Sequence, residues 1–328
     1  MTAALPLRAG SVGVSWYDDW CGDLDAALGA LPEVEACPHE LFRILARPRG
    51  GVRKRIALVH ENGAPLAVIA LRRRFDLWES VCDGVVPHAF AAMRPARWDA
   101  AAALGCLVHV NEWAGAPPAT AGSREIKPRY RVATNTDFDA LWKQQHNAES
   151  VARARNRCDK DGGFAFEVDG DNAAEWVIEN WRDRWADDRF GEAQTAEDAI
   201  EAARYLRTQR RYHAFRLLHH DQPVAGITML AADGVLHFMN SYRDDAYDRF
   251  GVGTRLFELF FRWAASSPYR MVDMGAGDYK ERWAPHDGEV TSFLLGPIHL
   301  RVAFQAIERG RSVAARLRPA RGDRDERG

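Results

Sequence analysis

The stretch Phe250-Gly251-Val252-Gly253-Thr254-Arg255 lies between a predicted strand at residues 235–241 and a predicted helix at residues 252–265. The first amide groups of a helix have no acceptor inside the helix, and they carry part of its positive dipole. Glycines beside them let a ligand approach the backbone without a Cβ in the way. This order of elements therefore predicts an anion site for a pyrophosphate. A tight turn with a helix cap is the alternative interpretation.

The helix predicted at residues 252–265 is apolar over most of its surface. After Thr254 its polar side chains are Arg255, Glu258 and Arg262, at steps of three and four. Such spacing places them on one narrow stripe of the helix. We expect this stripe to face water and the rest of the helix to be packed.

Two common nucleotide-binding patterns are excluded around this turn. No Lys-Ser or Lys-Thr pair follows the glycines, as a Walker P-loop requires, and no Gly-x-Gly-x-x-Gly opens a βα unit. The strands expected before the turn, at residues 213–219, 223–230 and 235–241, form an antiparallel meander. A parallel dinucleotide-binding unit would need a different order of elements.

An internal similarity predicts the architecture of the whole chain. Leu66-Ala67-Val68-Ile69-Ala70-Leu71 follows Pro65, and Val224-Ala225-Gly226-Ile227-Thr228-Met229 follows Pro223. Both segments come after an apolar strand and a polar turn, and both precede a strand with aromatic residues. The offset is about the length of one domain, which indicates a tandem repeat of one α/β module. The alternative is that any two hairpins look alike.

The remaining elements are predicted from hydrophobic periodicity and turn residues. Helices are expected at residues 23–30, 39–47, 148–160, 173–186, 196–209 and 302–317, a hairpin at 55–71, and strands at 77–82, 164–168, 271–274 and 291–295. Residues 1–15 are expected to be a loose lead-in and residues 115–123 a linker. We predict a module at 1–125, a second at 126–317 and a disordered tail at 318–328.

The composition is that of an ordinary globular protein, with 47% hydrophobic residues, 27% charged residues and a formal net charge of -2. Balanced charge does not favour nucleic-acid binding or a polybasic membrane anchor. The five cysteines are odd in number and lack close metal-ligand spacing, which indicates free thiols. No apolar run approaches the roughly 20 residues that span a bilayer. We expect a cytoplasmic protein without membrane insertion.

The meander, the glycine turn and the helix together resemble the GNAT acyltransferase superfamily. In that superfamily a Gln/Arg-x-x-Gly-x-Gly/Ala turn leads into the helix that holds the coenzyme A pyrophosphate. Gly251 and Gly253 match the pattern, but Asp248 occupies its first position, with Arg249 displaced by one. This departure is more similar to the FemAB-like and CelD-like (BioF2-like) branch.

Two further runs carry the resemblance to that branch. Residues 271–283 resemble its strand, glycine turn and closing signature, here Tyr279-Lys280-Glu281-Arg282-Trp283. Residues 153–164 resemble its basic helix before a Gly-Gly-aromatic strand. The resemblance covers residues 136–310 well, and the N-terminal half only as a degenerate repeat. It implies tandem GNAT-like modules of α/β (α+β) class, with a mainly antiparallel mixed sheet flanked by helices.

The resemblance also implies a donor and its contacts. Acetyl-coenzyme A is the expected co-substrate, and no metal is expected. Its predicted contacts are Asn240, Ser241, Tyr242, Arg249, Phe250, Gly251, Val252, Gly253 and Thr254. Backbone amides around Asn240–Tyr242 would hold the oxyanion of the transferred acyl group.

Residues just past the end of a strand are the first candidates for catalysis. Asp278 is a candidate base and Tyr279 a candidate acid; a turn aspartate and a packing tyrosine are the alternatives. Asp273 is a second candidate base, or a structural aspartate inside its strand. The candidate substrate contacts are Arg153, Arg157, Lys280 and Trp283. For the basic residues, a solvated surface is the alternative.

Three functions are compatible with these residues. The first is transfer of an acyl group, preferably acetyl, from coenzyme A to an amine or hydroxyl of a small molecule, saccharide or cell-envelope precursor. The second is a FemAB-like transferase that uses aminoacyl-tRNA, although no coiled-coil arm is visible. The third is an inactive scaffold with the GNAT fold. The pair His219-His220 at a hairpin turn lacks clustered cysteines or carboxylates, so we predict no metal site there.

Overall fold

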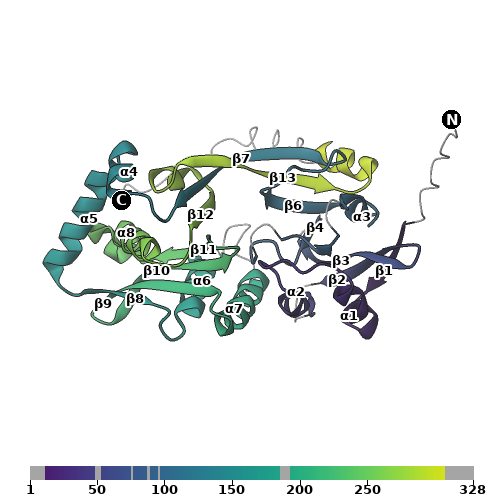
Figure 1. Ribbon diagram of the computed structural model, residues 1–328, viewed down its shortest axis with the longest axis horizontal. Helices are drawn as coiled ribbons and strands as arrows, with labels where there is room; N and C mark the ends of the chain where they lie inside the picture. The colour runs from purple at the N-terminus through teal and green to yellow at the C-terminus, as the bar shows by residue number, and fades with distance from the viewer. Residues whose placement is uncertain are drawn as a thin grey trace, which may run out of the picture.

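A computed structural model describes residues 12–48, 53–74, 77–86, 89–94, 97–184 and 193–306. Within this part of the chain, thirteen strands form one mixed sheet in the order β1-β2-β3-β4-β6-β13-β7-β12-β11-β10-β9-β8, with β5 paired to β3. Figure 1 shows an elongated molecule with the N-terminal half at one end and the C-terminal half at the other. Strands β7 and β13 run along both halves.

The strands are β1 (Val12–Tyr17), β2 (Lys54–Glu61), β3 (Ala64–Arg74), β4 (Leu77–Ser80), β5 (Ala92–Met93), β6 (Val108–Trp113), β7 (Gly122–Ala133), β8 (Phe164–Val168), β9 (Tyr212–His219), β10 (Gln222–Ala232), β11 (Val235–Arg243), β12 (Met271–Ala276) and β13 (His286–Leu295). The helices are α1 (Gly22–Gly29), α2 (His39–Ala46), α3 (Trp98–Ala102), α4 (Phe138–Gln144), α5 (Ala148–Asp161), α6 (Ala173–Arg184), α7 (Ala193–Thr208) and α8 (Val252–Ala265), with 3₁₀ helices η1 (Asp245–Phe250) and η2 (Asp278–Arg282). Residues 298–306 are also helical.

The two halves repeat one strand pattern. Each half contains an antiparallel meander, β2-β3-β4 in the first half and β9-β10-β11 in the second. The last strand of each meander pairs parallel with a strand that follows later in the chain. The parallel pairs are β4 with β6 and β11 with β12, and each covers only two or three residues before the strands separate. The repeat predicted from the sequence is therefore present in the fold. Pro65 and Pro223 are each the second residue of the matching strand, β3 or β10, beside a register shift.

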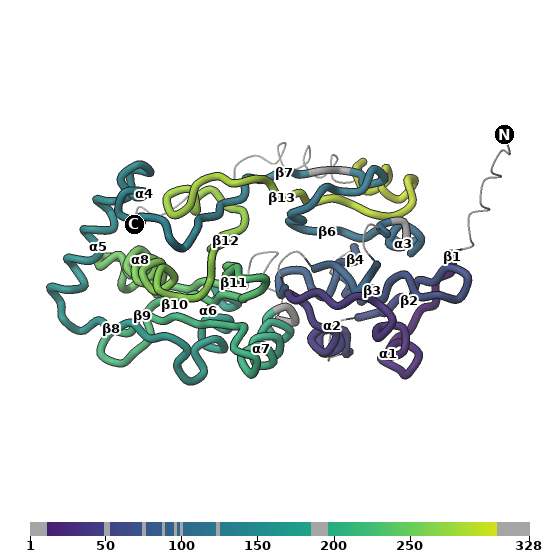
Figure 2. Tube along the Cα trace, viewed as in Figure 1, coloured from purple at the N-terminus to yellow at the C-terminus, as the bar shows by residue number. Residues whose placement is uncertain are grey.

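Each repeat of the strand pattern pairs its next-to-last strand with the last strand of the other repeat. The N-terminal β6 pairs with the C-terminal β13, and β12 pairs with β7. Strands β7 and β13 pair with each other between them, as the tube in Figure 2 shows. The boundary predicted at residue 125 falls inside β7. We propose that the modules 1–125 and 126–317 fold as one unit.

Several sequence expectations need correction. Residues 12–17 form the edge strand β1, so the loose lead-in predicted for residues 1–15 is wrong there. Strands β6 and β7 were not predicted, and the predicted linker 115–123 overlaps the start of β7. The C-terminal helix begins at residue 298 rather than 302. The predicted tail at 318–328 lies outside the described residues.

A buried ion pair joins the two halves below the sheet. Lys54 Nζ of β2 lies 3.0 Å from the carboxylate of Asp198 in α7, and both side chains are at most 1% exposed. The same ammonium donates to the carbonyl oxygen of Leu45 at 2.8 Å. Arg72 of β3 lies 3.9 Å from the other Asp198 oxygen. Around this pair, α1 and α2 share one hydrophobic core with α6 and α7.

We predict that Lys54→Met lowers the free energy of unfolding by about 3–5 kcal/mol, because it leaves the Asp198 carboxylate buried without its closest cation. Urea unfolding followed by tryptophan fluorescence measures this. The matched control is Arg153→Met, which removes a cation paired with Glu149 on an exposed face of α5, and it should cost less than about 1 kcal/mol. Equal losses for the two variants would contradict a stabilising contact between the halves.

Candidate functional site

The helix α8 begins directly after the glycine turn. Gly251 caps it in the left-handed conformation (φ 73°, ψ 39°), and the helix starts at Val252. No continuous helix runs through Gly251. Among the described residues, no acceptor bonds to the amides of Val252, Gly253 and Thr254. The first turn of α8 contains no acidic side chain. This helix start can therefore accept an anion.

Helix α5 supports the turn from one side. A Cβ at Gly251 would lie 3.1 Å from the Cβ of Ala154, so a side chain there would collide with α5 as well as being strained. Arg157 donates to the carbonyl oxygen of Arg249 at 2.9 Å, and the Cys158 thiol lies 3.8 Å from that of Phe250. The backbone of the turn is thus held in place while the amides of α8 stay available.

Arg243, at the end of β11, is a site residue that the sequence analysis missed. Its Cδ lies 3.4 Å from the position of a Cβ at Gly253. Its guanidinium pairs with Asp248 at 2.9 Å and is 47% exposed. Arg184 donates to the Arg243 carbonyl oxygen and to Asp245. The turn therefore has a cation beside the free amides, although Asp248 occupies the motif position where a basic or amide residue was expected.

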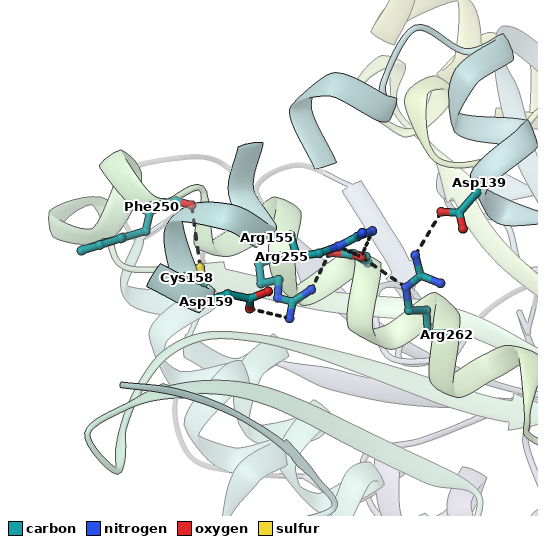
Figure 3. Close-up of polar contacts among 8 residues, drawn as sticks. Asp139, Arg155, Cys158, Asp159, Phe250, Arg255 and Arg262 are labelled. Carbon is teal, nitrogen blue, oxygen red and sulfur yellow. Dashed lines mark hydrogen bonds and ion pairs between the residues drawn. The ribbon is translucent and has the colours of Figure 1, made fainter. Parts of the chain in front are cut away.

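The polar stripe of α8 faces water only in part: Arg262 is exposed, as predicted, but Arg255 and Glu258 are largely covered. Glu258 is fully buried, and Arg155, Arg255 and Arg262 all bond to its carboxylate (Figure 3). Burial alone would raise the pKa of Glu258, but the hydrogen bonds from Arg155 and Arg255 outweigh burial and hold the pKa below its ordinary value. Helix α5 therefore covers part of this stripe, and these arginines serve the packing of α5 on α8.

The acyl-transfer position expected from the sequence lies where β11 and β12 separate. Their pairing ends at His237 and Asp273. Just beyond this point, two residues of β11, Met239 and Asn240, oppose the single residue Thr228 of β10. This arrangement is a β-bulge in β11. The Asn240 amide donates to the Thr228 hydroxyl at 3.1 Å, so this amide is already bonded. Beyond residue 237, the β12-facing edge of β11 has no partner strand among the described residues.

Tyr279 and Lys280 lie at this separation, on the 3₁₀ helix η2. Lys280 is only 8% exposed, and its side chain makes no hydrogen bond or ion pair with the described residues. Its Nζ lies 4.8 Å from the ring centroid of Phe238 and 5.6 Å from that of Tyr279. Burial lowers the pKa of Lys280 to about 8, although Glu112 and Asp273 act in the opposite direction. The alternative of a solvated surface lysine therefore does not describe Lys280, which is a buried amine.

Tyr279 is 46% exposed, and its phenol lies near Ser241 of β11. Burial of the phenol raises the pKa of Tyr279 to about 12. The group therefore keeps its proton at neutral pH and can donate it.

Other predicted site residues have different surroundings. Trp283 is 1% exposed and packs against Trp142 and Phe257, contacts that favour a packing role over a substrate contact. Asp273 is 2% exposed, receives hydrogen bonds from Arg129 and from the Gly275 amide, and lies 3.4 Å from His237. These contacts indicate the structural alternative for Asp273.

The remaining predicted residues are not drawn together. Asp278 is exposed, and no side-chain hydrogen bond or ion pair with the described residues orients it. Arg153 is 60% exposed and pairs with Glu149 at 3.1 Å. Arg157 holds the turn through Arg249. The exposed ion pair of Arg153 agrees with the alternative interpretation, a solvated helix face.

Residues 145–283 match the family model described as Acetyltransferase (GNAT) domain. The chain contains a GNAT domain. The match covers α5, the meander, the glycine turn, α8 and η2, and it confirms the resemblance to the GNAT superfamily in its FemAB-like branch. With the repeated strand pattern, it makes the fold a tandem GNAT arrangement. No curated protein matches the chain in sequence.

Solved structures share this fold at low sequence identity. L-PGS from Bacillus licheniformis is 14% identical, with a TM-score of 0.55 over 89% of this chain and 96% of that chain. The C-terminal domain of a putative lysylphosphatidylglycerol synthetase from Agrobacterium fabrum is 12% identical, with a TM-score of 0.51 over 86% and 95%. A conserved protein of unknown function from Bacteroides thetaiotaomicron is 8% identical, with a TM-score of 0.51 over 86% and 99%. These likenesses concern the fold alone.

Two groups of described residues have metal-ligating side chains close together: Asp161 with His219 and His220, and Glu79 with Asp83 and His109. The first corrects the expectation that no carboxylate gathers with the histidine pair, since His219 Nε2 lies 2.8 Å from Asp161.

No helix in the described part of the chain has the length and apolar character to cross a membrane.

We predict that the amine of Lys280 titrates near pH 8 in the folded GNAT domain, because burial destabilises the ammonium. Competitive labelling with dilute acetic anhydride, read at Lys280 by mass spectrometry, measures the midpoint. The same peptide labelled in urea is the control and should titrate at about pH 10.4. A folded midpoint as high as the unfolded one would show that the amine is hydrated.

Proposed function

We propose that the GNAT domain transfers an acyl group, with acetyl preferred, from acyl-coenzyme A to an amine or hydroxyl. The acceptor would be a small molecule, a saccharide or a cell-envelope precursor. The observation that carries this proposal is the start of α8, where three amides without acceptors lie beside the Arg243 guanidinium. Backbone amides, a helix dipole and an arginine are the groups that bind a pyrophosphate in proteins.

The residues present fit the donor at both of its ends. The amides of Val252, Gly253 and Thr254, with Arg243, would hold the pyrophosphate. The separation of β11 and β12 would receive the thioester, with the oxyanion near the edge of β11 around Ser241 and the buried ammonium of Lys280. Tyr279 keeps its proton at neutral pH and would protonate the leaving thiolate.

The space between the separated strands β11 and β12 would bring the donor, the acceptor and the charge of Lys280 together, as acyl transfer requires. Holding donor and acceptor together supplies much of the rate in such reactions. Lys280 is nine-tenths buried, so its charge acts in surroundings where water screens it little. A charge fixed beside a developing oxyanion stabilises the transition state more than the neutral thioester.

Calorimetric titration with acetyl-coenzyme A tests the proposal. We expect micromolar binding, which Gly253→Trp abolishes because the indole fills the corner below Arg243. Arg243→Ala should weaken binding about tenfold or more through the lost phosphate contact. The control is Gly29→Trp, since nothing lies within 4 Å of a Cβ at Gly29.

Each outcome separates the candidate functions. Absence of acetyl-coenzyme A binding in the unaltered protein would overturn the proposal and leave the aminoacyl-tRNA donor or the scaffold. Binding that survives Gly253→Trp would place the donor elsewhere in the molecule. Binding without release of coenzyme A in the presence of any acceptor would favour the scaffold.

A further inference from the structure

The end of α5 and the hairpin between β9 and β10 bring two histidines and a carboxylate together. Asp161 is the last residue of α5, His219 is the last residue of β9, and His220 follows it in the turn. The metal-ligating atoms of these three side chains all lie within 4.8 Å of one another. His219 Nε2 lies 2.8 Å from Asp161 Oδ1, and the two imidazole rings have centroids 4.3 Å apart.

The two glycines after α5 make this approach possible. Gly162 caps α5 in the left-handed conformation (φ 78°) and turns the chain back toward the hairpin. The His220 amide then donates to the Gly163 carbonyl oxygen at 2.9 Å. A Cβ at Gly163 would lie 2.9 Å from His220 Nε2 and 3.1 Å from Asp161 Oδ1. The lack of a side chain at Gly163 therefore leaves the room in which these two ligand atoms meet.

The separation of the ligand atoms suits a single metal ion. Zinc lies about 2.0–2.2 Å from histidine nitrogen and carboxylate oxygen, so two such ligands at a right angle are about 2.9 Å apart. The 2.8 Å between His219 Nε2 and Asp161 Oδ1 agrees with this value. A hydrogen bond between the same two atoms has a similar length, but it needs no third group. His220 supplies a third ligand atom at the same place.

The surroundings of the three side chains favour a cation. Among the described residues, Asp161 pairs with His219, and no lysine or arginine neutralises its carboxylate. The side chains of His219 and Asp161 are 16% and 27% exposed, so an ion from solvent can reach them. The His219 ring packs against Phe164 and Tyr247, with centroids 4.6 Å and 5.2 Å apart. This packing holds the ring in place before an ion binds.

The other group of close ligands, Glu79 with Asp83 and His109, is less suited to a metal ion. Arg72 pairs with Glu79 in the register of β3 and β4, and its guanidinium donates to the Asp83 carbonyl oxygen at 2.8 Å. The arginine already supplies the positive charge that a metal ion would bring to these carboxylates. This group also offers one imidazole, whereas the group at the hairpin offers two.

We propose that Asp161, His219 and His220 bind one divalent transition-metal ion of the zinc class, and that this ion fastens the end of α5 to the β9–β10 hairpin. Two imidazoles and a carboxylate are ligands that such metals prefer, whereas Mg²⁺ and Ca²⁺ prefer oxygen alone. The inference goes beyond the proposed function and does not depend on it. The sequence pattern could not indicate the site, because Asp161 and His219 are 58 positions apart in the chain.

Zinc titration followed by calorimetry tests the proposal on the full chain, carrying no histidine tag and freed of metal by dialysis against a chelator. We expect one ion per chain with a dissociation constant of about 10 μM or tighter. Magnesium at the same concentration should give no binding heat, because it prefers ligands that are all oxygen.

His220→Asn should weaken zinc binding about tenfold or more, because one ligand is lost. Asparagine tolerates the left-handed backbone of this residue (φ 47°), so the hairpin should keep its shape. The matched control is His146→Asn, since His146 is also an exposed histidine with a left-handed backbone (φ 56°), and it should bind zinc like the unaltered chain. Gly163→Ala should weaken binding as well, because its Cβ would push His220 away from Asp161.

Thermal unfolding measures whether the ion fastens the two segments. Zinc at about 100 times its dissociation constant should raise the Tm of the unaltered chain by about 4 °C or more. His220→Asn should lose at least about half of this shift at the same zinc concentration, and His146→Asn should keep all of it. Labelling of histidines with diethyl pyrocarbonate, read by mass spectrometry, locates the ion: zinc should shield His219 and His220 but not His146.

Four results would overturn the inference. The first is a dissociation constant for zinc weaker than about 100 μM in the unaltered chain. The second is equal zinc affinity in His220→Asn and His146→Asn, which would place the ion elsewhere. The third is shielding of His146 as strong as that of His220, and the fourth is zinc binding that leaves the Tm unchanged. Failure of acetyl-coenzyme A to bind would overturn the proposed function alone, because none of these measurements uses the coenzyme.

Discussion

The pairing of β7 with β13 is the constraint on which the other features depend. Each of these is the last strand of one repeat of the strand pattern and pairs with the next-to-last strand of the other repeat, β7 with β12 and β13 with β6. Neither half can bury its sheet edge alone, and an unpaired edge leaves backbone groups without partners. The same exchange sets Lys127 of β7 beside Glu112 of β6 and Arg129 of β7 beside Asp273 of β12. The fold therefore brings residues of both halves to one junction.

The two halves have kept similar polar pairs at the ends of their parallel strands but differ in the segments beyond those strands. The last paired residues are Glu79 with His109 in the first half and His237 with Asp273 in the second. The histidine Nδ1 lies 3.5 Å from a carboxylate oxygen in the first pair and 3.4 Å in the second. The glycine turn and α8 come after β11, whereas residues 81–86 after β4 form turns and α3, the helix between β4 and β6, has only 5 residues. The repeat thus kept the strand geometry in both halves, while the candidate anion site belongs to the second half.

Local patterns were sufficient to predict much of the fold. The hairpin around Asn62-Gly63, the meander before the glycine turn and helix α8 were predicted from turn residues and periodicity, which act within a few residues. Strand β7 was missed because its run of charged residues and Pro128 looks like a loop, and only pairing on both sides makes it a strand. The burial of Glu258 and Trp283 was equally hidden, since the side chains that cover them come from α5 and α4, more than a hundred residues earlier in the chain.

The departure of the glycine turn from its family pattern has a local physical account. An aspartate at position 248 would repel a pyrophosphate if nothing neutralised it, and on sequence alone this charge favours an inactive fold. The structure pairs the Asp248 carboxylate with Arg243 at 2.9 Å, and Arg243 lies over Gly253. A phosphate group competes well for an arginine in such an exposed ion pair, because the pair itself contributes little. Arg243 reaches the corner from the end of β11. The strand before the turn would therefore supply the cation that the family pattern places within the turn itself.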